Sequence, residues 1–248
     1  MKITILAALK EEINSFRKTQ EMRIVKNASP FIEYQFQFSK IDVSLMLTGV
    51  GKVSAAMVAQ YAVNHTNPNY LIVTGIAGGL QPGLALGDVV VSKDCLQHDL
   101  DLTHMGFKIG QIPFTEHRIL VADPKLVELA LATTIEGQRI VPGRILTGDQ
   151  LIVAPNAEEN KRLSFLQGDV VEMEGAAIAL VATTNGIPFV IIRSVSDCVS
   201  TKSPTNFGPL IRQAAANSCA VCYGVLSGLN KLCHHKVEPI TMIKNRDE

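Results

Sequence analysis

The sequence predicts an α/β fold, in which a single domain forms a three-layer α/β/α sandwich around a mixed, mostly parallel twisted sheet. Short apolar runs typical of buried strands alternate along the chain with longer segments of helical spacing. The 248 residues are 47% hydrophobic and 19% charged, which supplies a substantial core. We find no low-complexity linker, so we expect one domain over residues 1–230 and a polar C-terminal tail over residues 231–248.

The expected strands are apolar runs bounded by glycine, proline or polar clusters. The first run, KITILAA, is apolar at successive positions, as in a strand buried on both faces. FIEYQFQF and IDVSLMLT are joined by a short polar connection, which predicts a hairpin, and YLIVTG ends in a glycine-rich turn. In chain order, the strand-like or extended segments are residues 2–8, 31–38, 41–48, 70–75, 87–95, 139–149, 169–175 and 187–197.

The expected helices lie between these strands. VSAAMVAQYAV and AAIALVATT are rich in alanine and other small residues with helical spacing. A further long helix precedes the C-terminal tail. In chain order, the expected helices cover residues 10–18, 53–63, 156–165, 176–184 and about 207–229.

Composition narrows the class of function. The 23 basic and 23 acidic residues cancel, so the chain lacks the excess of positive charge that nucleic-acid binding needs. We find no stretch near the roughly 20 apolar residues that span a bilayer, and charged residues follow the first apolar run where a signal peptide would have its cleavage site. Five cysteines, an odd number, favour free thiols. We expect a cytoplasmic protein that handles a small molecule.

The candidate site residues are the polar side chains that end the apolar runs, because ligands of α/β folds bind beyond the carboxyl ends of the strands. The first strand is followed by Glu11 and Glu12, and the strand at 70–75 by the segment TGIAGGL. Two later segments supply the remaining candidates, which are Glu172, Met173, Glu174, Arg193, Ser196 and Asp197.

Each candidate also has a purely structural interpretation. Arg193 inside the apolar run PFVIIRSV needs an anionic or polar partner, which is either a ligand or a structural ion pair. Glu172 and Glu174 would point the same way in an extended segment and can accept hydrogen bonds from a ribose diol, although one of them can instead cap the next helix. Asp197 can be a turn or helix-capping residue, and Glu12 a solvated acid.

Seven segments in order carry a family resemblance: TGVGKVSAA, TGIAGGL, GDVVVS, HDLDLT, LTGDQLI, VVEMEGAAIA and IRSVSD. Together they resemble the 5′-methylthioadenosine/S-adenosylhomocysteine nucleosidases of the purine nucleoside and uridine phosphorylase superfamily, over residues 1 to about 227. The resemblance implies a nucleoside phosphorylase-like fold and hydrolysis of an adenine N-glycosidic bond. It implies that Asp197 is the general acid at purine N7 and that Glu12 is the base that activates water. Arg193 would help to fix this water and the nearby carboxylates.

The resemblance also implies the substrate-binding residues. Glu174 would hold the ribose hydroxyls and Met173 would pack under the sugar, with Glu172 beside them. The backbone of Ile152 would bind the adenine edge. The remaining expected contacts are Leu9, Val50, Ile76, Ala77, Gly78, Leu151, Ser196, Phe207 and Met105. Three of these, Ile76, Leu151 and Met105, depart from the usual pattern of the family, which leaves the preferred 5′ substituent open.

Several alternatives stay open at this point. The resemblance implies methylthioadenosine and S-adenosylhomocysteine as substrates, and it leaves 5′-deoxyadenosine and 6-amino-6-deoxyfutalosine open as further ones. A phosphate-dependent phosphorylase is disfavoured because Val73 stands where phosphorolytic relatives typically carry arginine, Ile76 has no hydroxyl, and Glu12 would repel phosphate. A non-catalytic nucleoside-binding protein would be expected to lack Glu12, Glu174 or Asp197.

The expected cofactors and partners are few. We expect no cofactor and no metal, because Cys219 and Cys222 fit buried thiols of a helix better than they fit a zinc site with Cys233. The resemblance implies a homodimer, in which the segment at Leu102–Met105 reaches the pocket of the neighbouring subunit. The other expected partner is the nucleoside, with neither nucleic acid nor membrane.

Overall fold

The computed structural model describes residues 1–28, 31–153, 156–198 and 207–235. Within them a 10-stranded sheet is covered by helices. The helices are α1 (Lys10–Arg17), α2 (Lys52–Thr66), α3 (Pro124–Leu131), α4 (Ala157–Phe165), α5 (Gly175–Thr184), α6 (Phe207–His235) and a 3₁₀ turn, η1 (Thr103–Met105). The strands are β1 (Lys2–Ala7), β2 (Arg23–Ala28), β3 (Phe31–Phe38), β4 (Ile41–Leu47), β5 (Tyr70–Gly79), β6 (Val89–Gln97), β7 (Leu120–Val121), β8 (Ile140–Thr147), β9 (Val170–Glu172) and β10 (Phe189–Cys198).

The sheet is mixed, as predicted. Its order is β10-β6-β8-β9-β5-β1-β4-β3-β2, and β10 also pairs with β5. Parallel pairs join β4, β1, β5 and β10 through the centre, whereas the edge strands β2 and β3 pair in antiparallel fashion. Because β10 pairs on both sides, the strands β5, β10, β6, β8 and β9 curl into a closed ring.

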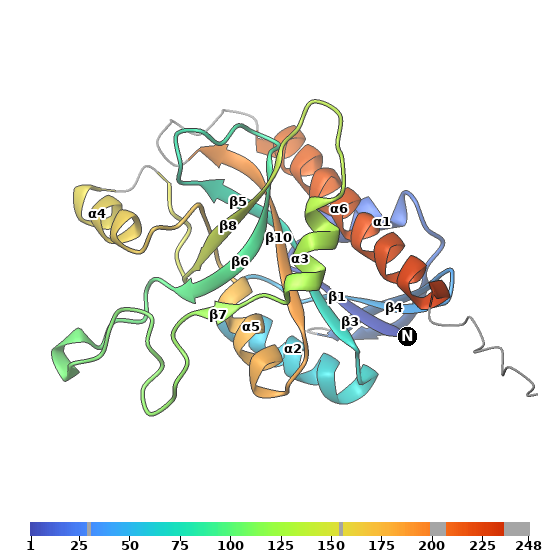
Figure 1. The fold of residues 1–248 in the computed structure, drawn as a ribbon, viewed down its shortest axis with the longest axis horizontal. Coiled ribbons are helices and arrows are strands. Elements are labelled where there is room, and N and C mark those ends of the chain that lie inside the picture. Colours follow the sequence, from blue (N-terminus) through green and yellow to red (C-terminus); the bar gives the residue numbers. More distant parts are fainter. Residues whose placement is uncertain (29–30, 154–155, 199–206, 236–248) are drawn as a thin grey trace, which may run out of the picture.

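Helices cover both faces of the sheet, which confirms the three-layer arrangement (Figure 1). On one face α1, α3 and α6 pack over a core that includes Ile5, Val43 and Ile192. On the other face α2 and α5 lie side by side over a core that includes Leu6 and Ile191. The alternation of Ile5 and Leu6 between the two cores explains why the first strand is apolar throughout.

Most predicted elements are confirmed, and the two largest differences from the predicted bounds are at the ends of β5 and α6. The predicted turn after Gly75 is wrong, because β5 continues to Gly79 and pairs there with β9 and β10. Helix α6 continues to His235, so the first residues of the expected tail are helical. The polar stretch from residue 236 lies outside the described residues.

Four elements are absent from the sequence-based expectation: β2, α3, the two-residue strand β7 and the 3₁₀ turn η1. The sequence RIVKNA of β2 is mostly exposed and lacks the alternation of apolar and polar residues that marks a strand, so its pairing with β3 alone makes it extended. Helix α3 has a clear start signal, since Asp123 accepts a hydrogen bond from the Leu126 amide and Pro124 follows it. Among the described residues, we find no helix with the length and hydropathy needed to span a membrane.

Candidate functional site

A cavity of about 390 Å³ lies where the ends of β1, β5, β9 and β10 meet. It collects residues from segments that are far apart in the sequence, including four of the predicted carboxylates and Arg193. Its lining is Ala8, Leu9, Glu12, Val50, Ile76, Ala77, Gly78, Leu151, Val171, Glu172, Met173, Glu174, Arg193, Ser196 and Asp197. Of these, Ala8 and Val171 were not singled out from the sequence, although Ala8 lies within the segment KITILAA and Val171 within the segment VVEMEGAAIA.

Arg193 is the charged centre of this cavity wall. It is 1% exposed, and its Nη2 donates to Glu172, in close contact, and to Glu174 at 3.3 Å. Burial alone would lower the pKa of Arg193, but Glu172, Glu174 and Glu12 together raise it, so the guanidinium stays charged. The prediction that Arg193 requires an anionic partner is confirmed, and these partners are carboxylates of the chain itself.

Gly75 makes room for this arrangement. A methyl group on its Cα would overlap Nη1 of Arg193 and would lie 2.7 Å from Oε1 of Glu12. Its φ is not in the left-handed region, so glycine is needed here for its missing side chain rather than for backbone freedom. Arg193 and Glu12 therefore reach the cavity across the backbone of β5.

Glu12 is buried, with 1% exposure, and is not the solvated acid of the structural interpretation. It lies in the first turn of α1, and its carboxylate accepts hydrogen bonds from the amides of Ala8 (2.7 Å), Leu9 (2.9 Å) and Ile76 (3.2 Å). Burial raises its pKa, and Arg193 and the three amides oppose part of this rise. Its neighbour Glu11 is exposed. Glu12 is thus a fixed carboxylate on the cavity wall with a raised affinity for a proton.

Glu172 has the capping role that the sequence left open for Glu172 or Glu174. Its carboxylate accepts from the amides of Glu174 (3.1 Å) and Gly175 (2.8 Å) at the start of α5. The hydroxyl of Thr147 and the guanidinium of Arg193 also donate to it at close range. These four protein donors occupy the carboxylate, so Glu172 serves mainly to hold the wall together.

Glu174 lies beyond the end of β9, with φ −131° and ψ −36°, so the predicted alternation of two extended glutamates is wrong. Both glutamates still converge, because Arg193 contacts each of them. Oε1 of Glu174 accepts a hydrogen bond from the amide of Gly51 at 2.9 Å. Burial and the nearby Glu172 raise the pKa of Glu174 to about 7, against the lowering effect of Arg193 and of the Gly51 amide.

Asp197 stands at the end of β10, where a register shift against β5 falls between Val195 and Asp197. Such irregularities re-aim side chains at strand ends. The Ser196 hydroxyl donates to Oδ1 of Asp197 at 2.8 Å, and Asp197 is half-buried at the cavity. This places a carboxyl group on the wall formed by β10.

The remaining lining is apolar. Leu9, Val50, Ile76 and Leu151 contribute side chains, and Leu151 is 79% exposed. The cavity thus combines charged groups on one wall with apolar groups elsewhere, a combination typical of sites for small organic ligands.

Two of the predicted contacts lie outside the lining, and the structure does not describe the side chain of a third. Ile152 is buried in a separate cluster with Leu146 and Leu163. Met105 ends the turn η1 and is 63% exposed. Phe207 begins α6, but its side chain lies outside the described residues.

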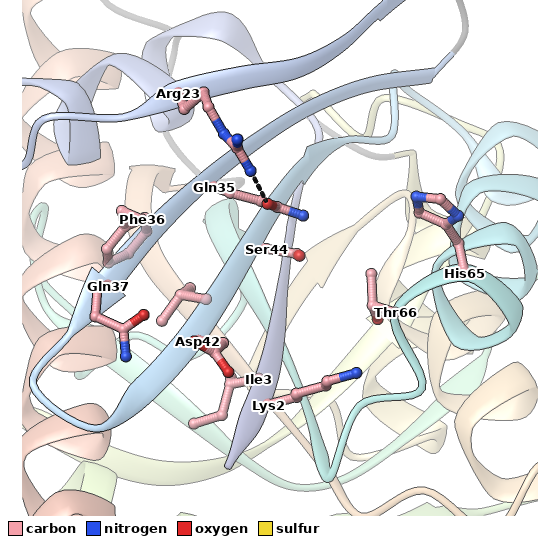
Figure 2. Close-up of a pocket in the computed structure, with 11 residues that line it drawn as sticks. Lys2, Ile3, Arg23, Gln35, Phe36, Gln37, Asp42, Ser44, His65 and Thr66 are labelled. Carbon is pink, nitrogen blue, oxygen red and sulfur yellow. Dashed lines mark hydrogen bonds between the residues drawn. The ribbon is translucent and has the colours of Figure 1, made fainter.

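A second cavity, of about 480 Å³, lies on the polar face of the hairpin β3–β4 and the end of α2 (Figure 2). There the Arg23 guanidinium donates to Gln35 at 3.1 Å, and Asp42 is the acidic residue of the lining. This cavity has no cluster of buried carboxylates around an arginine, so we place the candidate site at the first cavity.

The chain matches known proteins along most of its length. The family model described as the phosphorylase superfamily matches residues 2–227. A 5′-methylthioadenosine/S-adenosylhomocysteine nucleosidase of Geobacillus kaustophilus is 36% identical over 92% of this chain and 97% of its own length.

Solved structures give the same result. The nucleosidase of that name from Neisseria meningitidis, in complex with methylthio-immucillin-A, superposes with a TM-score of 0.84 at 32% identity, over 92% of this chain and 99% of its own. The corresponding enzyme from Colwellia psychrerythraea, in complex with adenine, has a TM-score of 0.83 at 32% identity, over 92% and 96% of the two chains.

Proposed function

This chain belongs to the phosphorylase superfamily, among its 5′-methylthioadenosine/S-adenosylhomocysteine nucleosidases, and on that premise we propose the reaction and its residues. The chain hydrolyses the N-glycosidic bond of 5′-methylthioadenosine and S-adenosylhomocysteine, releasing adenine and a 5-thio-substituted ribose. The observation that carries the assignment of residues is the meeting of Glu12, Glu174 and Asp197, from three separate segments, around one cavity of about 390 Å³.

The chemistry requires three contributions from the protein. Adenine leaves poorly as an anion, so Asp197 donates a proton to purine N7 as the bond to the sugar breaks. Glu12 accepts a proton from the attacking water, and its raised pKa gives it a higher affinity for that proton than an ordinary carboxylate has. Glu174 accepts hydrogen bonds from the ribose hydroxyls close to the carbon on which positive charge develops.

Arg193 and Glu172 support these groups. Arg193 holds Glu174 directly and lowers the pKa of Glu12, which keeps both carboxylates available as acceptors. Glu172 anchors Arg193 and the start of α5. The apolar side chains of Leu9, Val50, Ile76 and Leu151 would surround the purine and the 5′-thio substituent.

Water is favoured over phosphate as the nucleophile. A phosphate dianion requires unpaired cationic groups, whereas Arg193 contacts Glu172 and Glu174. Val73, at the position where phosphorolytic relatives typically carry arginine, is 1% exposed in the apolar core. Glu12 adds a further negative group at the cavity.

The deciding experiment measures adenine release from methylthioadenosine, S-adenosylhomocysteine and 6-amino-6-deoxyfutalosine, each with and without inorganic phosphate. We expect release of adenine from the first two, with a free sugar as the second product and a rate that does not depend on phosphate. A sugar 1-phosphate would instead establish a phosphorylase. Tight nucleoside binding without adenine release would establish a binding protein.

We also infer that the chain acts as a homodimer. Val53 on α2 is 80% exposed, and Val50, Leu151 and Met105 are also exposed around the cavity mouth and on η1. These exposed apolar side chains support the proposal that a second chain covers this surface. Sedimentation equilibrium should give twice the chain mass, and a monomer at assay concentration would contradict this assignment.

A further inference from the structure

Lys52 joins three loops beside the cavity. It is the first residue of α2, and its Nζ donates to Oδ1 of Asp99 at 2.7 Å and to Oε1 of Gln97 at 3.0 Å. The same Nζ lies 4.0 Å from Oδ2 of Asp149. The side chains of Lys52 and Asp99 are 18% and 19% exposed, so solvent screens this pair much less than it screens a surface pair.

The backbone amides of Lys52 and Asp149 also join these loops through hydrogen bonds. Oδ1 of Asp149 accepts a hydrogen bond from the Lys52 amide at 2.8 Å, and the Asp149 amide donates to Oδ2 of Asp99 at 2.9 Å. Burial would raise the pKa of Asp99, but the hydrogen bonds from Lys52 and from the Asp149 amide lower it overall, so this carboxylate stays ionised. Lys52, Asp99 and Asp149 form a closed set of contacts, which we call the Lys52 clamp.

Gly51, the residue before α2, lies next to the Lys52 clamp. Gly51 has φ +94°, which favours glycine, and a methyl group on its Cα would lie 3.1 Å from Oδ1 of Asp149. In this position the Gly51 amide donates to Oε1 of Glu174 at 2.9 Å. Gly51 therefore links the Lys52 clamp to the carboxylate of Glu174 in the cavity, through one peptide bond and one hydrogen bond.

We propose that Lys52 is a positioning residue, which acts with Asp99 and Asp149 to hold the Gly51 amide against the carboxylate of Glu174. This inference rests on the proposed function, in which the ionised Glu174 binds the ribose hydroxyls. Lys52 itself is absent from the cavity lining, so it acts through Gly51.

The groups around Glu174 determine whether loss of the Gly51 hydrogen bond raises or lowers the pKa of Glu174. Glu172 from β9 and Glu12 from α1 favour its protonated form, whereas Arg193 from β10 and the Gly51 amide favour its ionised form. Near the clamp, Asp99 is also within the electrostatic influence of His98, and Lys52 and Arg162 act on the same histidine. Loss of the Gly51 hydrogen bond raises the pKa of Glu174 above its value of about 7, so ribose binding weakens first on the acid side.

The test is the pH profile of the full-length Lys52→Met variant between pH 5.5 and 9. We expect the acid limb of kcat/KM to move to higher pH, with KM for methylthioadenosine raised about tenfold at pH 7, as for the loss of one hydrogen bond to a charged group. At high pH, where Glu174 is ionised in both proteins, kcat should stay within about twofold of the wild type. Lys52→Arg should restore most of the wild-type profile, and Lys125→Met, at an exposed lysine of α3, should not change it.

A second readout does not require turnover. The ¹³C chemical shift of the Glu174 carboxyl group, followed by titration, should report a higher pKa in Lys52→Met and, if that variant is unstable, in Asp99→Asn. An unchanged acid limb and an unchanged titration in a folded variant overturn the role of Lys52 alone. A wild-type protein that releases no adenine overturns the proposed function, and the titration then still decides whether the clamp acts on Glu174.

Discussion

We expect the Asp197→Asn variant to lose about 10³-fold in kcat for adenine release, because general acid catalysis contributes about 10²–10⁴-fold and asparagine has no proton to transfer. Asparagine has the shape of aspartate, and its oxygen can still accept the hydrogen bond that Ser196 donates at 2.8 Å. The fold should therefore be spared, with a free energy of unfolding within about 0.5 kcal/mol of the wild type. Steady-state kinetics and urea unfolding measure the two quantities.

A substrate whose leaving group needs no proton distinguishes proton donation by Asp197 from any other role of this residue. A nitrophenyl ribofuranoside releases a phenolate that needs no proton, so the variant and the wild type should cleave it at similar rates. Asp42→Asn, at an exposed aspartate of β4 beside the second cavity, is the control for removing a carboxylate. An Asp197→Asn variant that releases adenine at more than a tenth of the wild-type rate would remove Asp197 as the acid.

The sequence identified the charged residues of the site because of where they occur. Glu12, Glu174, Arg193 and Asp197 each end or interrupt an apolar run, and parallel strands bring such ends together at one edge of the sheet. The central strands were predictable for the same reason, since burial on both faces leaves a continuous apolar run, as in KITILAA.

Features that depend on tertiary contacts were not predictable. The glycine-rich sequence after Gly75 predicts a turn, and only its pairing with β9 and β10 keeps the chain extended to Gly79. Which of Glu172 and Glu174 caps α5, and which is left to bind a ligand, depends on which carboxylate faces the amides at the start of α5. The Lys52 clamp joins residues 47 and 97 positions apart in sequence, and no local pattern marks it.

The balance of buried charge connects the fold with the chemistry. Three carboxylates, Glu12, Glu172 and Glu174, surround one buried arginine, so the wall carries more negative than positive groups. Burial raises the pKa values of both Glu12 and Glu174, and the negative charge of Glu172 adds to the rise at Glu174. An oxocarbenium-like sugar develops positive charge within this cavity, where preorganised carboxylates stabilise it and a phosphate dianion would be repelled.

Arg193→Met should be the most destabilising single change at this wall. It leaves three buried carboxylates without their counter-ion, and removing one partner of a buried ion pair costs about 3–5 kcal/mol. We expect a loss of that size in the free energy of unfolding at pH 8, measured by urea unfolding, together with loss of adenine release. Arg193→Lys keeps a positive charge but loses the guanidinium, whose Nη2 donates to both Glu172 and Glu174, so its stability should lie between those of Arg193→Met and the wild type.

The pH dependence of this loss distinguishes a missing counter-ion from a missing side chain. Without Arg193, the pKa values of Glu12 and Glu174 rise further, because Arg193 lowers both in the native protein. An acid whose folded pKa exceeds its ordinary value of 4.5 destabilises the fold progressively as the pH rises from that value through the folded pKa. The difference in unfolding free energy between Arg193→Met and the wild type should therefore shrink from pH 8 to pH 5. Arg23→Met, at an exposed arginine that donates to Gln35, should show a small difference at both values. A loss of equal size at pH 5 and pH 8 would mean that Arg193 stabilises the wall by packing and not by charge.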